Sequence, residues 1–169
     1  MSQHVLSVTV ENKPGVLARI SSMFARRGFN IHSLAVGPTE DPKLSRMTLV
    51  VDGPAMEQIV KQLYKLVHTV KVIEHAPEET VEREIMLLRV SADPTRRGEI
   101  LDAAHLFEAK AVDVGATTIA FEISGDPARL ADFLELMRTY GIVSLVKSGR
   151  IAMARDAKGT TRKQRLRSA

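Results

Sequence analysis

One order of predicted elements, βαββαβ, occurs twice along the sequence, and this repeat restricts the possible folds more than any other feature. Strands are indicated by alternating apolar residues, as at Leu6, Val8 and Val10, and helices by apolar residues three or four positions apart. The first copy has strands near residues 5–10, 30–36, 44–52 and 70–74, with helices from Pro14 to Arg27 and after Gly53-Pro54. The second copy has strands near residues 84–90, 111–114, 117–124 and 142–147, with helices at 97–107 and from Pro127 after an Asp126 cap.

A βαββαβ unit predicts a ferredoxin-like fold, in which two helices cover one face of an antiparallel sheet. The predicted fold class is therefore α+β, with one such domain in residues 1–77 and a second in residues 78–154. The uncovered sheet face and the sheet edges favour pairing with another such domain, either within the chain or in a homodimer.

The last residues, 155–169, differ from both repeats. They carry 6 basic residues, 1 acidic residue and a single large apolar residue, Leu166, whereas the whole chain has a formal net charge of +4. A segment with so little apolar surface cannot offset the entropy lost on ordering, so a disordered basic tail is predicted. Its composition suits a solubilising terminus and, as an alternative, an arm for nucleic acid or another acidic partner.

The composition argues against several kinds of chemistry. The 169 residues include no Cys, and no two of the five His stand three or four positions apart, which disfavours a metal site. The sequence contains neither a phosphate-binding loop that ends in Gly-Lys-Ser/Thr nor a Gly-x-Ser-x-Gly nucleophile elbow. Apolar runs are far shorter than the roughly 20 residues of a membrane-spanning helix, and the first residues lack a secretion-signal pattern. We therefore expect a cytoplasmic protein without a catalytic site.

The turn from residue 11 to residue 17 has a chemical use of its own. Here a strand leads directly into a helix, whose first backbone N–H groups attract an anion such as a carboxylate. Gly15 leaves space for a ligand, and the Asn12 side chain offers both a donor and an acceptor. A free amino acid matches these groups. The alternative is purely structural, with Asn12 as the helix N-cap and Pro14-Gly15 as turn residues.

Several stretches resemble a known family. They are residues 12–17, 26–31, 44–48 and 83–87, which read Asn-Lys-Pro-Gly-Val-Leu, Arg-Arg-Gly-Phe-Asn-Ile, Leu-Ser-Arg-Met-Thr and Arg-Glu-Ile-Met-Leu. The N-terminal half resembles an ACT domain, and the chain from residue 3 to about residue 153 resembles the small regulatory subunits of acetolactate synthase.

The resemblance implies a homodimeric subunit without an active site, which binds the catalytic large subunit, raises its activity and makes it sensitive to feedback inhibition by valine. Thiamine diphosphate, magnesium and FAD would belong to the catalytic subunit, with no cofactor in this chain. In the family, valine lies between two ACT domains, where the helix-entry turn of one chain faces the second strand of the other. On this sequence the resemblance assigns the turn to Asn12, Gly15, Val16 and Leu17, and the strand to Asn30 and Ile31.

Some alternatives stay open at this stage. Valine, leucine and isoleucine all suit the effector role, because an apolar pocket discriminates between them by only about 1 to 3 kcal/mol. The second repeat lacks the Asn-x-x-Gly pattern at residues 92–98, so one effector site per chain is expected. An RNA-binding protein of the RRM type would share the βαββαβ order, but strands 6–10 and 44–52 have no aromatic residues for stacking bases. A small acid/base enzyme of the same fold is a third hypothesis.

Overall fold

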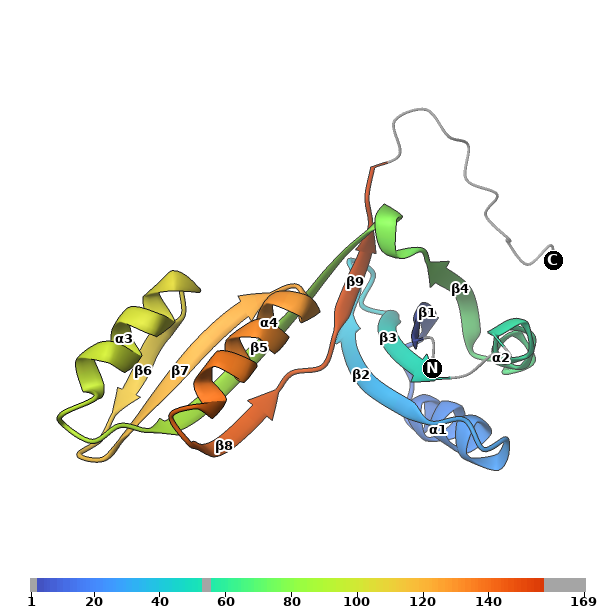
Figure 1. Ribbon diagram of the computed structural model, residues 1–169. Helices are drawn as coiled ribbons and strands as arrows, with labels where there is room; N and C mark the ends of the chain where they lie inside the picture. Colours follow the sequence, from blue (N-terminus) through green and yellow to red (C-terminus); the bar gives the residue numbers. More distant parts are fainter. Residues whose placement is uncertain (1–2, 53–55, 157–169) are drawn as a thin grey trace. The chain divides into compact units, whose positions relative to one another are not determined.

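The computed structural model describes residues 3–52 and 56–156, which form two compact units (Figure 1). The first unit contains the described residues up to Val81 together with those from Arg150 onward, and the second is Glu82–Gly149. The first unit contains β1 (Gln3–Glu11), α1 (Val16–Arg26), β2 (Ile31–Pro38), β3 (Leu44–Asp52), α2 (Met56–Tyr64), β4 (Thr69–His75), the 3-10 turn η1 (Pro77–Glu79) and β9 (Ile151–Ala154). The second contains α3 (Arg97–Leu106), β6 (Lys110–Val114), β7 (Thr118–Gly125), α4 (Pro127–Arg138) and β8 (Ile142–Lys147), and β5 (Thr80–Ser91) runs through the boundary.

The first unit is built on a sheet of order β2-β3-β1-β4 with antiparallel neighbours. Alternation along β1 sends Leu6, Val8 and Val10 to one face. These side chains pack with Ile20 of α1 and Ile59 of α2, so both helices cover the same face of the sheet. This confirms the predicted fold class for the first repeat and places β2 at a sheet edge.

Glycines set both ends of α1. Gly15 is the N-cap residue, with a φ of 82°, and Gly28 follows the helix with a φ of 69°. The N–H of Gly28 donates to the Ala25 carbonyl, and the next N–H, from Phe29, donates to the Phe24 carbonyl, each over 3.1 Å. Because L-residues rarely adopt such positive φ values, glycine at these two positions fixes the length of the helix.

The second unit repeats the architecture with a sheet of order β6-β7-β5-β8. Leu88 of β5 and Phe121 of β7 pack against Ile100 of α3 and Phe133 of α4, so both helices again cover one face. The predicted cap is confirmed, since the Asp126 side chain accepts a hydrogen bond of 2.9 Å from the Arg129 N–H. The second ferredoxin-like unit is thus as the periodicity predicts.

Strand β9 was not predicted. It pairs with β5, and its Ala152 packs with Val5 and Val50 on the sheet face opposite α1 and α2. The backbone N–H of Arg150 also donates to the Ser33 Oγ atom on this face over 2.8 Å. The face that the sequence left uncovered is therefore partly covered by the same chain. A segment of four residues is too short to show a period, which is why the pattern did not indicate it.

Some predictions fall on parts of the chain that lie outside the described residues. These are the helix entry at Gly53-Pro54 and the tail from residue 157 onward. In the ranges that are described, no helix has the length and apolar character needed to cross a membrane. Over the same ranges, His, Asp and Glu side chains form no group of three that could hold a metal ion.

Candidate functional site

The turn between β1 and α1 presents backbone N–H groups at the start of a helix. The first helical hydrogen bond runs from the Arg19 N–H to the Gly15 carbonyl over 3.1 Å, so the N–H groups of Leu17 and Ala18 precede the helical ladder. The Val16 N–H has only a long bond of 3.4 Å, to the Lys13 carbonyl. Among the described residues, no side chain caps the helix. This end of α1 therefore offers donors and the positive end of the helix dipole to an anion.

Gly15 keeps the approach to these donors open. A Cβ atom built at this position would meet nothing within 4 Å, and the residue is exposed. Val16 behind it is buried, whereas the Leu17 side chain is 44% exposed. The turn thus combines N–H donors with an apolar side chain that is available for contact.

Asn12 has a different role from the N-cap considered in the sequence analysis, because Gly15 occupies that position. Its backbone N–H donates to the Lys43 carbonyl over 2.7 Å, and its Nδ2 donates to the Pro42 carbonyl over 3.1 Å. Asn12 therefore fastens the turn to the connection between β2 and β3. The Oδ1 atom is the side-chain group that this bond leaves available as an acceptor.

A charged cluster beside the turn was missed by sequence reasoning. The Glu11 carboxylate lies 2.7 Å from the Lys13 Nζ atom and 2.8 Å from the His68 Nδ1 atom. Hydrogen bonds from Lys13, and then from His68, lower the pKa of Glu11. Only the pairing of β1 with β4 brings residue 68 next to residue 11, and a local sequence pattern cannot show that pairing.

Asn30 and Ile31 lie at the other end of α1 from the turn. At about 1.5 Å per residue, the 11 residues of α1 span roughly 16 Å. Asn30 is exposed, and Ile31 is the partly buried first residue of the edge strand β2. One chain therefore brings together Asn12, Gly15, Val16 and Leu17, but it does not bring Asn30 and Ile31 to them.

Two family models together match most of the chain. Residues 6–71 match the AHAS small subunit-like ACT domain, and residues 83–156 match the small subunit of acetolactate synthase. A probable acetolactate synthase small subunit from Archaeoglobus fulgidus is 50% identical over 158 residues, which covers 92% of this chain and 99% of that protein. The chain belongs to the family of acetolactate synthase small subunits.

Other members of the family agree in sequence and in fold. The acetolactate synthase small subunit of Mycolicibacterium smegmatis is 49% identical over 159 residues, covering 92% of this chain and 93% of that protein. The crystal structure of the small subunit from Thermotoga maritima superposes with a TM-score of 0.85 at 38% identity, covering 93% and 99% of the two chains. The family resemblance and the non-catalytic, regulatory class of the chain are thereby confirmed.

Proposed function

We propose that two copies of this chain bind valine between their first units and thereby control a catalytic large subunit of acetolactate synthase. In this proposal the chain activates the catalytic subunit and confers feedback inhibition on it. The observation that carries the proposal is the separation of the two half-sites: the turn and Asn30 lie at opposite ends of α1, roughly 16 Å apart, while β2 lies at a sheet edge.

Symmetry supports the pairing of half-sites from different copies. Two β2 edges related by a two-fold axis run antiparallel, so the Ile31 end of one strand meets the Pro38 end of the other. The Pro38 end belongs to the same end of the sheet as the turn, because Asn12 is bonded to the connection that follows β2. Dimerisation through β2 thus carries Asn30 and Ile31 of one copy toward Gly15 of the other.

The groups of such a shared site match an amino acid. The N–H groups at the start of α1 would bind the carboxylate, and the Asn30 amide would bind the ammonium or the carboxylate end. Leu17 and Ile31 would supply apolar contact to a branched side chain. Valine is the effector in this proposal, and leucine and isoleucine are the alternatives.

Regulation requires the effector to discriminate between states of the assembly. Valine has to bind the inhibiting arrangement more tightly than the activating one, and such coupling is worth about 1 to 3 kcal/mol. Thiamine diphosphate, magnesium and FAD are placed in the catalytic subunit by this proposal, and the assembly is placed in the cytoplasm. In this proposal the chain itself binds the effector and the catalytic subunit, and the arrangement of the assembly changes when the effector binds.

Calorimetric titration of the purified chain with valine tests the proposal. We expect saturable binding near one valine per chain, and we expect Gly15→Asp to weaken it by at least about tenfold, or ~1.4 kcal/mol, because its carboxylate enters the space of the effector carboxylate. Gly15→Asn is the control for backbone strain, because it adds a side chain of similar size without the negative charge. It should retain more valine affinity than Gly15→Asp. Gly98→Asp makes the same change in the second repeat and should bind like the wild type.

The assembled enzyme supplies a second readout. Gly15→Asp and Asn30→Ala should each remove inhibition by valine while the catalytic subunit is still activated. Undiminished valine binding by Gly15→Asp would refute the site. If a variant lost activation of the catalytic subunit as well as inhibition by valine, the turn would be needed for assembly of the enzyme rather than for binding of the effector.

A further inference from the structure

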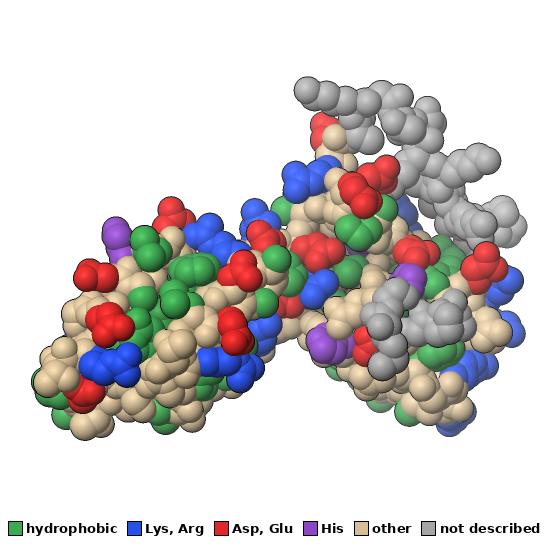
Figure 2. Space-filling model, in the orientation of Figure 1, with side chains coloured by type: hydrophobic (Ala, Val, Ile, Leu, Met, Phe, Trp, Pro, Cys, Tyr) green, Lys and Arg blue, Asp and Glu red, His purple; other side chains and the backbone are tan. Residues whose placement is uncertain are grey.

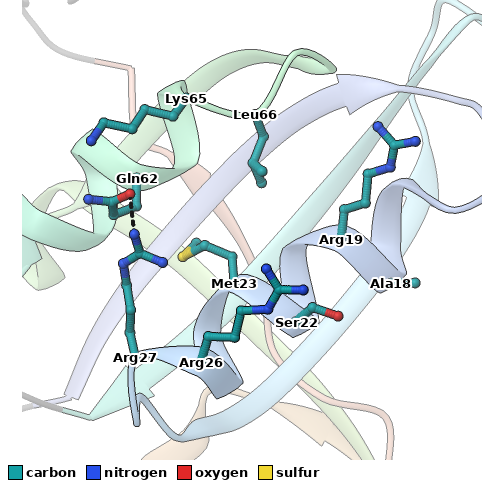
Figure 3. Close-up of a pocket in the computed structure, with 9 residues that line it drawn as sticks. All are labelled: Ala18, Arg19, Ser22, Met23, Arg26, Arg27, Gln62, Lys65 and Leu66. Carbon is teal, nitrogen blue, oxygen red and sulfur yellow. Dashed lines mark hydrogen bonds between the residues drawn. The ribbon is translucent and has the colours of Figure 1, made fainter.

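A cavity of about 400 Å³ lies between α1 and α2, on the side of the helices away from the sheet, and the amino-acid site makes no use of it (Figure 3). Met23 and Leu66 form its apolar part, while Ser22 and Gln62 contribute polar groups. A volume of this size falls within the usual range for sites of small molecules.

Four cations line this cavity. The set comprises three arginines from α1 and its C-cap and one lysine that follows α2: Arg19, Arg26, Arg27 and Lys65. Figure 3 shows Arg26 and Arg27 on either side of Met23, with the Arg27 guanidinium donating to the Gln62 Oε1 atom over 2.6 Å. Figure 2 shows Lys and Arg side chains gathered along the part of the surface where α1 and α2 lie.

Ion pairs distinguish these four cations from others in the described part of the chain. Within residues 3–52 and 56–156, no carboxylate forms an ion pair with any of the four. The second unit behaves differently, since Arg89, Arg129 and Lys147 each have a carboxylate at 3.1 Å or less. Like charges held around one cavity repel one another, and an anion removes that cost.

A smaller cavity of about 140 Å³ adjoins the first and shares Arg19, Lys65 and Leu66 with it. Thr69 forms part of its wall and is 3% exposed. The Thr69 Oγ1 atom is buried and has no hydrogen-bond partner among the described residues. An unsatisfied buried hydroxyl is costly, and this one lies in the wall that Arg19 and Lys65 also line.

We propose that the groove between α1 and α2 binds a small phosphate-bearing polyanion, distinct from the amino-acid effector. Arginine presents a planar fork of donors that matches phosphate oxygens, and lysine and the Ser22 hydroxyl add further donors. The size of the cavity favours a small molecule over a nucleic-acid backbone, which would track along an extended surface. The proposed ligand is a second one, although Val16 of the proposed valine site also lines the smaller cavity.

Calorimetric titration of the full chain with pyrophosphate at low salt tests this site. We expect saturable binding that Arg19→Gln/Arg26→Gln weakens by about tenfold or more, because two charge-assisted contacts are lost. The matched control is Arg165→Gln/Arg167→Gln, which removes the same charge from the basic C-terminal segment and should change affinity by less than about twofold.

A second variant keeps the proposal testable if the double substitution disturbs folding. Ser22→Asp retains all four cations but places a carboxylate among them, and it should also weaken pyrophosphate binding by about tenfold. The proposal is overturned if wild type shows no saturable binding, or if the variant of the C-terminal segment loses as much affinity as the groove variant. Citrate bound as tightly as pyrophosphate would overturn the assignment to phosphate groups, and binding of RNA without binding of pyrophosphate would overturn the small-molecule class.

Discussion

The two repeats share an architecture but complete the turn after their first strand in different ways. In the first repeat, Gly15 is the N-cap residue of α1, with a φ of 82°, and among the described residues no side chain caps either α1 or α3. In the second, the Asp93 carboxylate accepts hydrogen bonds from the Thr95 N–H, over 2.8 Å, and from the Thr95 hydroxyl. The Arg97 guanidinium also donates to two carbonyls of the connection between β6 and β7, over 3.0 and 2.8 Å.

The second turn therefore supplies its own carboxylate, and the first turn has room for one from a ligand. Hydrogen bonds from the Thr95 side chain and N–H lower the pKa of Asp93, so the turn favours its ionised form. A ferredoxin-like fold does not by itself specify a ligand, and under the proposed function this difference between the turns places the effector site in the first repeat.

The largest expected effect on stability comes from truncating a buried aromatic side chain in the core of one unit at a time. Phe133 is fully buried in the second unit, 5.4 Å from the Phe107 ring, so Phe133→Ala should lower the free energy of unfolding by about 3 to 5 kcal/mol. Phe24→Ala should cost a similar amount in the first unit. Urea unfolding measures both values.

The same pair of variants separates the roles of the units. The Phe24 ring packs edge-on against the ring of Phe29, with centroids 6.4 Å apart. Phe29 precedes Asn30, so Phe24→Ala should also weaken valine binding. Phe133→Ala should leave that binding intact. Equal losses of valine affinity in both variants would contradict the assignment of the effector site to the first unit.

A smaller effect is expected from Asn12→Ala, which removes the hydrogen bond to the Pro42 carbonyl. The cost in stability should be about 0.5 to 1.5 kcal/mol, together with weaker valine binding, because the turn is no longer fastened to the next connection. Thr95→Ala is the matched control in the second turn and should not alter valine affinity. Thermal unfolding and calorimetry measure the two quantities.

The smallest effect is a dependence of stability on pH. Glu11 and Asp93 both have lowered pKa values, through hydrogen bonds from Lys13 and His68 and from Thr95 respectively. Each carboxyl therefore contributes stability above its ordinary pKa of about 4, and that contribution is lost as the pH falls through the lowered value in the folded state.

Glu11→Gln and Asp93→Asn should each make the melting temperature less sensitive to acid below about pH 5. Because Asp93 is exposed and Glu11 is only partly buried, the change should be modest. Melting curves recorded at successive pH values measure it. An unaltered acid sensitivity in both variants would show that these hydrogen bonds do not favour the ionised forms.

Local patterns in the sequence predicted most of the fold. Alternation located the strands from β1 to β8, and Gly28 and Asp126 marked helix ends where the structure has them. Contacts between distant residues were beyond such patterns. The bond from Asn12 to Pro42 and the return of Ala152 to the first sheet depend on pairing across the fold, which no local period encodes.

The candidate site was predictable to the same limited degree. The turn around Gly15 could be recognised because the residues of a strand end, a glycine and a helix start are contiguous. The cations of the groove could not, because helical periodicity identifies the buried stripe of α1 and says nothing of which exposed residues face α2.

In the proposed dimer, each effector site takes its turn from one copy and its strand from the other. A mixture of Gly15→Asp and Asn30→Ala chains, refolded together in equal amounts, tests it by valine titration. Each variant alone should bind valine at least about tenfold more weakly than the wild type. Half of the mixed dimers should hold one intact site, giving about 0.25 tightly bound valine per chain by statistical pairing. No recovery of binding in the mixture would contradict a site shared between copies.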